Sequence, residues 1–236
     1  MQNEEVWESD PGGSVRVVKA ILFDFDGTLI DASEAIIQTF NSVMNRFGLD
    51  PWTHSRITTS IGKPLVTLFK EVRPDCQPSQ LQKMLKVYEE LAQEEDPRAV
   101  RLKPNVRQTL TWLSENVQMG VVTSRRGRGA RNILRRFELE EYFSAIIGIE
   151  SVDRPKPDGE PLRLALELLG VPAEEALMVG DTPDDVHSAR NAGVKSAGVT
   201  TGHQALSELL AAEPDYIIHD LSELTQLPEL AGTRSQ

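Results

Sequence analysis

Residues 17–30 read VVKAILFDFDGTLI, an apolar run that leads directly into two aspartates, a glycine and a threonine. The segment Ala20–Phe23 is short, β-prone and followed by a glycine turn, which predicts a buried strand. Asp24 and Asp26 stand two residues apart, so in extended backbone their side chains point to the same side. The sequence therefore places two carboxylates at the carboxyl end of a buried strand, where ligands bind in open α/β sheets.

Short apolar runs alternate with amphipathic helical patterns over most of the remaining chain. Further strands are expected at Val121–Val122, Ala145–Ile149, Ala176–Val179, Ser196–Val199 and Tyr216–Ile218. Between them, helical spacing of apolar residues predicts helices over Val106–Asn116, Arg128–Phe137, Leu162–Leu169 and Asp184–Ala192. Such alternation is typical of a doubly wound α/β fold, a parallel sheet with helices on both faces.

Residues 31–103 break this alternation. Prolines and glycines separate three helical patterns there, at Ser33–Phe47, Pro64–Val72 and Ser79–Glu95. A stretch this long without a strand exceeds an ordinary crossover connection, which predicts an inserted helical subdomain. The core is then expected over 17–30 and 104–228, with flexible tails at 1–16 and 229–236.

Composition excludes several classes of protein. The 236 residues include 25 Lys+Arg and 36 Asp+Glu, a net charge of −11, which argues against nucleic acid or an anionic membrane as the main partner. A single cysteine, Cys76, excludes an internal disulfide and a CxxC metal site. No apolar run is long enough to span a bilayer and the first residues do not resemble a signal peptide. We therefore expect a cytoplasmic protein.

A second acidic group follows another expected strand, in the segment Val179-Gly180-Asp181-Thr182-Pro183-Asp184-Asp185. Acidic residues stabilise helix N-termini, so a capping motif by itself explains this pattern. A solvated acidic turn would likewise explain Asp24 and Asp26. If the two groups share one edge of the sheet, however, their carboxylates repel unless a cation lies between them. Oxygen ligands of this kind suit Mg²⁺.

Thr123 and Lys156 add a hydroxyl and an ammonium group at two more expected strand ends. A single lysine in a proline-rich loop is most often a solvated surface charge. Four successive strand ends that each carry a polar group suited to phosphoryl transfer favour a phosphate site instead. In that chemistry one carboxylate serves as nucleophile and another as general acid and base.

In these motifs the chain resembles phosphatases of the haloacid dehalogenase superfamily, with a helical cap between the first and second motifs. The first motif matches Asp24-Phe25-Asp26-Gly27-Thr28, the second Thr123, the third Lys156 and the fourth Gly180–Asp185. The resemblance covers residues 17–225. It implies a Rossmann-like core, Mg²⁺ as cofactor and an aspartyl-phosphate intermediate.

The resemblance also implies a role for each motif residue. Asp24 would attack phosphorus, and Asp26 would protonate the leaving oxygen and then activate water. Thr123 and Lys156 would bind the phosphoryl group. Mg²⁺ would be held by Asp24, the backbone carbonyl of Asp26 and Asp181, with Asp185 acting through a water.

Substrate contacts are less clearly marked. Ser124 and Arg125 follow Thr123 where relatives commonly have asparagine and lysine, and both are candidates to bind substrate. The residues after Gly27 resemble phosphoglycolate phosphatases and related pyrophosphatases. Phosphoglycolate is therefore the expected substrate, with pyrophosphate or a sugar phosphate as alternatives. Lys63 and Arg56, in the helical region, are candidates to bind an anionic leaving group, although Lys63 also fits a simple exposed helix-start turn.

Two other classes of protein share some of these features. A receiver domain also uses an acidic cluster, a hydroxyl and a lysine, but it has no large insertion after its first strand. A binding protein for phosphorylated ligands would need no nucleophile, yet Asp24 and Asp26 are both present. The residues favour an enzyme that acts on a small phosphorylated metabolite, and they predict no oligomeric state.

Overall fold

A computed structural model describes residues 17–93 and 99–231 of this chain, so the expected N-terminal tail lies outside the described residues. Six parallel strands form the main sheet in the order β5-β4-β1-β6-β7-β8. Their bounds are β1 Ala20–Phe23, β4 Gln118–Val122, β5 Ala145–Ile147, β6 Ala176–Gly180, β7 Lys195–Val199 and β8 Tyr216–Ile218. The predicted parallel sheet is confirmed.

The first strand lies at the centre of the sheet, at the point where the strand order reverses. From β1 the chain continues to β4 and β5 on one side, and then crosses to β6, β7 and β8 on the other. Phe23 pairs with Val121 of β4 and with Val179 of β6, so the carboxyl ends of these three strands are level. A reversal of this kind opens a crevice at the carboxyl ends of the strands.

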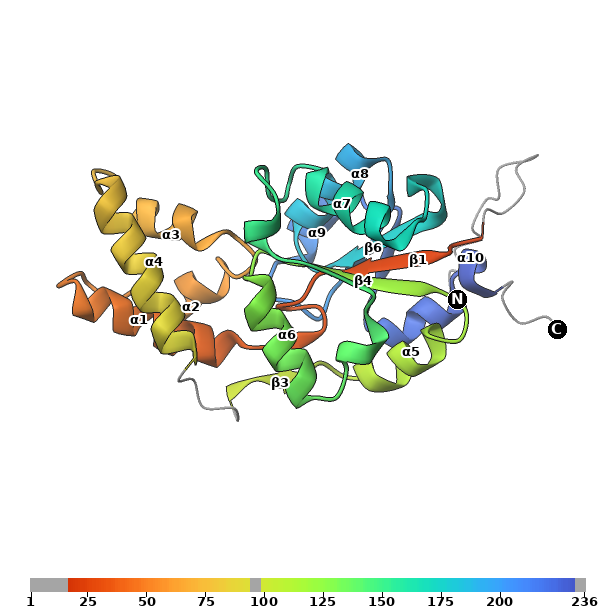
Figure 1. The fold of residues 1–236 in the computed structure, drawn as a ribbon, viewed down its shortest axis with the longest axis horizontal. Helices are drawn as coiled ribbons and strands as arrows, with labels where there is room; N and C mark the ends of the chain where they lie inside the picture. Colours follow the sequence, from red (N-terminus) through yellow and green to blue (C-terminus); the bar gives the residue numbers. More distant parts are fainter. Residues whose placement is uncertain (1–16, 94–98, 232–236) are drawn as a thin grey trace, which may run out of the picture.

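Alternate residues of β1 enter different cores because successive side chains of a strand point to opposite faces. Ile21 and Phe23 pack with the helix α5 (Val106–Leu113) in the larger core. Ala20 and Leu22 pack on the other face, against α7 (Glu160–Leu169) and α8 (Pro183–Ala192). Figure 1 shows α7 and α8 on one side of β1 and α5 on the other. Helices thus cover both faces, as a doubly wound sheet requires.

Four helices within residues 33–93 gather at one end of the molecule, beyond the sheet (Figure 1). They are α1 Ser33–Arg46, α2 His54–Thr58, α3 Leu65–Val72 and α4 Pro78–Gln93. Phe40 of α1 stacks on Phe69 of α3 with 5.2 Å between ring centroids, and Tyr88 of α4 meets Phe69 edge-on. We refer to α1–α4 as the helical unit.

Two short strands connect the helical unit to the sheet. β2 (Ile30–Asp31) pairs antiparallel with β3 (Arg101–Leu102), so the entering and leaving chain segments lie side by side. Lys103 follows β3 and its Nζ donates to the carbonyl of Thr201 at 2.6 Å. The helical unit is therefore attached to the sheet through two adjacent strands.

The remaining helices cover the sheet or follow its last strands. They are α6 Gly127–Arg136, α9 Leu206–Ala211 and α10 Pro228–Ala231, with 3₁₀ turns at Glu140–Tyr142, Ile149–Ser151, Ala173–Glu175 and Leu221–Gln226. None of the helices within 17–93 and 99–231 has both the length and the hydrophobicity needed to cross a membrane.

The prediction of a flexible C-terminal tail from residue 229 is wrong for the first residues of that segment. Leu230 is fully buried in the larger core, and Glu229 accepts a hydrogen bond from Lys195 at 2.8 Å. The apolar side chain of Leu230 anchors α10, because its burial removes apolar surface from water. Residues 232–236 lie outside the described part of the chain.

Candidate active site

Three neighbouring strands bring polar side chains to one edge of the sheet. Asp24 follows β1, Thr123 follows β4 and Asp181 follows β6, and all three are at least 95% buried. Asp24 N donates to Val179 O at 2.9 Å, which extends the parallel ladder to the first aspartate. The residues predicted to meet at this edge do so because the level register of the strands carries them there.

Lys156 reaches the same point from the segment after β5. Its Nζ donates to Asp24 Oδ1 and to Asp185 Oδ1, both at 2.6 Å, and to the carbonyl oxygen of Val122 at 3.1 Å. The lysine side chain is 4% exposed, so it is not a solvated surface charge. Burial alone would lower the pKa of Lys156, but Asp185 and Asp24 raise it above its usual value.

Asp185 takes part in both structures that its sequence context allowed. Its Oδ2 accepts hydrogen bonds from Thr182 N at 3.0 Å and from Thr182 Oγ1 at 2.7 Å, which forms a capping box at the start of α8. Its Oδ1 binds Lys156, which joins the helix cap to the acidic cluster. Capping therefore positions Asp185 and does not remove it from the site.

A divalent cation fits between the carboxylates of Asp24, Asp181 and Asp185, each of which offers an oxygen within 4.8 Å of the others. Asp24 Oδ2 is buried and has no hydrogen-bond partner among the described residues, a costly arrangement unless something binds it. Asp181 Oδ1 accepts a hydrogen bond from Thr28 at 2.8 Å. Oxygen donors of this kind suit Mg²⁺.

The electrostatics of the three carboxylates agree with a cation site. Burial, and then the repulsion from Asp185, raise the pKa of Asp24 to about 7, although Lys156 opposes this. Burial, and then the charges of Asp24 and Asp185, raise the pKa of Asp181 well above its usual value. A bound cation would relieve both effects because it stabilises the charged forms.

Two glycines make room for Asp181. A Cβ atom on Gly27, which has a φ of 101°, or on Gly202 would overlap the Asp181 carboxylate. The motif glycine after Asp26 is thus required both by its left-handed backbone and by the carboxylate packed against it. Gly202 was not identified from the sequence, because nothing near it in the chain marks its contact with Asp181.

Asp26 lies outside this cluster and forms a pair with Arg125. The guanidinium donates to Asp26 Oδ1 at 2.8 Å and to Oδ2 at 3.0 Å, a two-point contact between residues 99 positions apart in the sequence. The backbone N–H of Arg125 donates to Thr123 Oγ1 at 3.0 Å. Arg125 was predicted to bind substrate, and its pairing with Asp26 was not anticipated.

A cavity of about 740 Å³ lies between this edge of the sheet and the helical unit. Asp24, Asp26 and Thr123 line it together with Ser124 and Arg125. Lys63, in the loop before α3, lines the cavity from the helical unit. Nearby, a Cβ atom on Gly62 would crowd the side chain of Thr182, so the loop approaches the acidic cluster closely.

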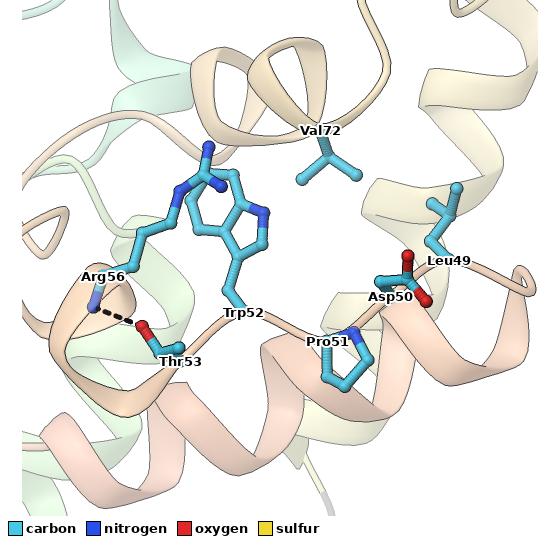
Figure 2. Close-up of a pocket in the computed structure, with 7 residues that line it drawn as sticks. All are labelled: Leu49, Asp50, Pro51, Trp52, Thr53, Arg56 and Val72. Carbon is cyan, nitrogen blue, oxygen red and sulfur yellow. Dashed lines mark hydrogen bonds between the residues drawn. The ribbon is translucent and has the colours of Figure 1, made fainter.

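Arg56 does not reach this cavity, so its predicted contact with the leaving group is not supported by its position. Its guanidinium carbon lies over the ring of Trp52, 3.6 Å from the centroid. Both side chains line a separate pocket of about 370 Å³ in the helical unit, with Asp50 and Val72 nearby (Figure 2). Stacking on Trp52 accounts for the place of this arginine.

Comparison with known proteins identifies the family. The model of the haloacid dehalogenase-like hydrolases matches residues 21–199, which include the edge of the sheet and the helical unit. The chain belongs to this family. The resemblance found in the four motifs is confirmed, and the enzyme is a hydrolase and phosphatase of the haloacid dehalogenase type.

Similar proteins come from several bacteria. A protein of Caldanaerobacter subterraneus named as pyrophosphatase PpaX is 35% identical to this chain, over 89% of this chain and 94% of that protein. The pyrophosphatase PpaX of Bacillus velezensis is 33% identical, over 89% of this chain and 96% of that protein. A solved structure assigned to the haloacid dehalogenase-like hydrolases, from Bacteroides fragilis, is 34% identical with a TM-score of 0.83. It covers 88% of this chain and 99% of its own.

Proposed function

We propose that this phosphatase hydrolyses a small phosphorylated metabolite with the help of Mg²⁺ and through a phosphate ester on Asp24. The observation that carries the proposal is the environment of Asp24, whose Oδ1 is held by buried Lys156 while Oδ2 has no hydrogen-bond partner among the described residues. Asp24 also lines the cavity. A carboxylate held at one oxygen and free at the other is suited to bind a cation and to attack a substrate.

Mg²⁺ would be held by Asp24, Asp181 and the backbone carbonyl of Asp26, with Asp185 acting through a water. When bound, it would neutralise the repulsion between the carboxylates and the phosphate dianion. Thr123 and Lys156 would bind the phosphoryl oxygens, and Ser124 would contribute its hydroxyl, which is buried without a partner in the described chain. These roles are carried over from the resemblance, and they are supported by the place of Asp24, Thr123 and Ser124 in the cavity lining and by the contact of Lys156 with Asp24.

Hydrolysis would proceed in two displacements. In the first, a carboxylate oxygen of Asp24 forms a bond to phosphorus, the bond from phosphorus to the leaving oxygen breaks, and Asp26 gives that oxygen a proton. In the second, Asp26 takes a proton from water, the water oxygen bonds to phosphorus, and the bond to Asp24 breaks. Inorganic phosphate leaves and both aspartates return to their starting states.

The inserted subdomain predicted at residues 31–103, which contains the helical unit, would act as a cap over the phosphoryl site, with Lys63 facing the leaving group. Phosphoglycolate remains the substrate expected from the motifs, and the names of the relatives support pyrophosphate about equally. A cytoplasmic location and the absence of nucleic-acid and membrane partners remain predictions.

A phosphate-release assay tests this proposal. The enzyme would be assayed with Mg²⁺ or with EDTA on phosphoglycolate, pyrophosphate, a set of sugar phosphates and an aryl phosphate. We expect release that requires Mg²⁺ and is lost in Asp24→Asn. Release that persists in the Asp24→Asn variant would refute the nucleophile, and no release with any substrate or metal would favour a protein that only binds phosphorylated ligands.

A further inference from the structure

The cavity has two unlike sides. Toward the sheet it is polar, with Asp24, Asp26 and Thr123 at the strand ends. Toward the helical unit it is mainly apolar, with side chains from the loop before α3, from α3 and α4, and from α6 of the core. The apolar side chains on this side include Ile61, Leu65, Val66, Leu85, Ala92 and Ile133, and we call these six the apolar roof.

Five members of the apolar roof are only partly buried, Ile61 being the exception. They line the cavity, so their apolar surface is in contact with whatever fills it. A small anion would leave this surface against water, which is unfavourable in proportion to the apolar area. The volume of about 740 Å³ also lies within the range of pockets that enclose drug-sized molecules.

Three of the five cationic side chains that line the cavity are matched by protein acceptors, and the other two are Lys63 and Arg128. Arg125 binds Asp26, and Arg126 Nε lies 2.6 Å from Glu89 Oε1 of α4. Arg136 donates to the carbonyl of Val100 at 3.0 Å. A second anionic group on a substrate would have to compete with these partners for the arginines.

The start of α6, which also borders the cavity, is occupied as well. A helix N-terminus is a natural site for a phosphate or carboxylate. Here Gly127 N donates to both carboxylate oxygens of Glu150, at 3.0 and 3.1 Å. Glu89 and Glu150 both line the cavity, so acidic residues offset part of the positive charge that would attract an anionic leaving group.

We infer that the enzyme acts on a phosphomonoester whose leaving group has an apolar body, of about the size of an aromatic ring or a medium alkyl chain. This inference rests on the proposed function. The phosphoryl group would lie at Asp24 and Thr123, the ester oxygen at Asp26, and the apolar body against the apolar roof. Pyrophosphate and phosphoglycolate lack such a body and would leave the roof uncovered.

A series of alkyl phosphates tests the inference because the alcohols differ in apolar area and hardly in acidity. We would measure kcat/KM for ethyl, butyl and hexyl phosphate with Mg²⁺, beside phosphoglycolate and pyrophosphate. We expect kcat/KM to rise about two- to fourfold for each added methylene, where fourfold corresponds to a methylene that is fully buried. Hexyl phosphate should exceed both small anions.

Two outcomes would overturn the inference and leave the proposed function intact. One is a series in which kcat/KM does not rise with chain length, and the other is a clear preference for pyrophosphate or phosphoglycolate. Failure of the proposed function looks different, because then no substrate would give Mg²⁺-dependent release that disappears in Asp24→Asn.

Variants of the apolar roof test whether these residues cause the dependence of kcat/KM on alkyl chain length. Leu85→Asn should lower the ratio of kcat/KM for hexyl phosphate to kcat/KM for ethyl phosphate by about tenfold. The reason is that the leucine side chain would bury a few carbon atoms of the hexyl group, and asparagine would not. Leu168→Asn is the matched control, because Leu168 lies on α7 with 63% of its surface exposed and should leave the ratio unchanged. If Leu85→Asn fails to fold, Val66→Thr keeps the shape of the side chain and should lower the same ratio. An unchanged ratio in a folded roof variant would contradict the inference.

Discussion

The edge of the sheet and the helical unit form opposite sides of one cavity and are built in opposite ways. At the sheet edge, Asp24, Lys156 and Asp185 are almost fully buried charges held by hydrogen bonds of 2.6 Å. In the helical unit, the cavity lining is mainly apolar, and the aromatic cluster of Phe40, Phe69 and Tyr88 supports it.

The difference matches the proposed division of the site, in which the sheet edge carries out the reaction and the helical unit selects the leaving group. Groups that must attack, protonate or bind a phosphate need fixed positions, and the ends of hydrogen-bonded strands supply them. Groups that select a leaving group need shape and apolar area, which helices packed through side chains supply. Changes at the sheet edge should therefore affect the reaction with every substrate, while changes in the helical unit should affect some substrates and spare others.

The largest effect is expected at Asp24. Asp24→Asn removes the proposed nucleophile, so kcat should fall by about 10⁴-fold or more with every substrate. The far-UV circular dichroism should stay that of the original protein because asparagine has nearly the same shape. If Asp24→Asn lowered activity only with some substrates, the division between reaction and selection would fail.

Lys156→Met tests whether the same edge depends on its buried charges for stability. Asp24 and Asp185 would lose the ammonium group between them, at a cost of about 3–5 kcal/mol in the free energy of unfolding. Urea unfolding in EDTA measures this cost. Lys195→Met is the matched control, because its partner is Glu229 and its own side chain is 51% exposed, so the loss should be about 1 kcal/mol or less. Equal losses in the two variants would contradict the special role of the buried lysine.

Arg125→Ala tests a residue at the boundary between the two regions. The variant frees the carboxylate of Asp26 from its two guanidinium contacts, so proton transfer by Asp26 should become less well positioned. We expect kcat to fall by about 10- to 100-fold with all substrates, within the range for misplaced general acids and bases. A rise in KM with unchanged kcat would indicate that Arg125 binds substrate and does not position Asp26.

Stability without metal should depend on pH through the acidic cluster. Folding raises the pKa of Asp24 to about 7 and also raises that of Asp181, both above the ordinary value of 3.8. A carboxyl group of this kind contributes stability that is fully present below about pH 4 and is lost as the pH rises through its raised pKa, which is about 7 for Asp24.

Mg²⁺ should reverse that loss because, as proposed, it would bind the charged carboxylates. The increase in Tm on adding Mg²⁺ should therefore be larger at pH 8 than at pH 5.5, with apparent binding at least about tenfold tighter. Differential scanning fluorimetry at both pH values measures this, and Asp24→Asn should reduce the difference. The same increase in Tm at both pH values would argue against a metal at these carboxylates.

The smallest effect is expected at Arg56. Because Arg56 stacks on Trp52 in a separate pocket, Arg56→Ala should change kcat/KM by less than about twofold and stability by about 0.5–1 kcal/mol. Lys63→Ala is the comparison, since Lys63 lines the cavity at the sheet edge and the variant should change KM for anionic leaving groups more than for alkyl phosphates. A large loss of activity in Arg56→Ala would show that the helical unit moves this residue to the site.

Several elements were predictable because their signal is local. The strands Ala20–Phe23 and Tyr216–Ile218 have the predicted bounds, and the helix predicted at Ser33–Phe47 ends one residue earlier. The helix α2 was not predicted, since its five residues His54–Thr58 are too few to show a helical period. The short strands β2 and β3 were missed for a related reason, because each is two residues long and forms only by pairing with the other.

The sequence by itself determined the chemistry of this protein. A carboxylate pair, a hydroxyl, a lysine and a second acidic group each follow an apolar strand, and parallel strands carry their ends to one edge. Only the tertiary structure decided what surrounds that chemistry: the burial of Lys156 between two carboxylates, the pairing of Arg125 with Asp26, and the apolar roof. These depend on contacts between residues far apart in the chain, such as the 99 positions that separate Arg125 from Asp26. Packing creates such contacts, and no local pattern of residues records them.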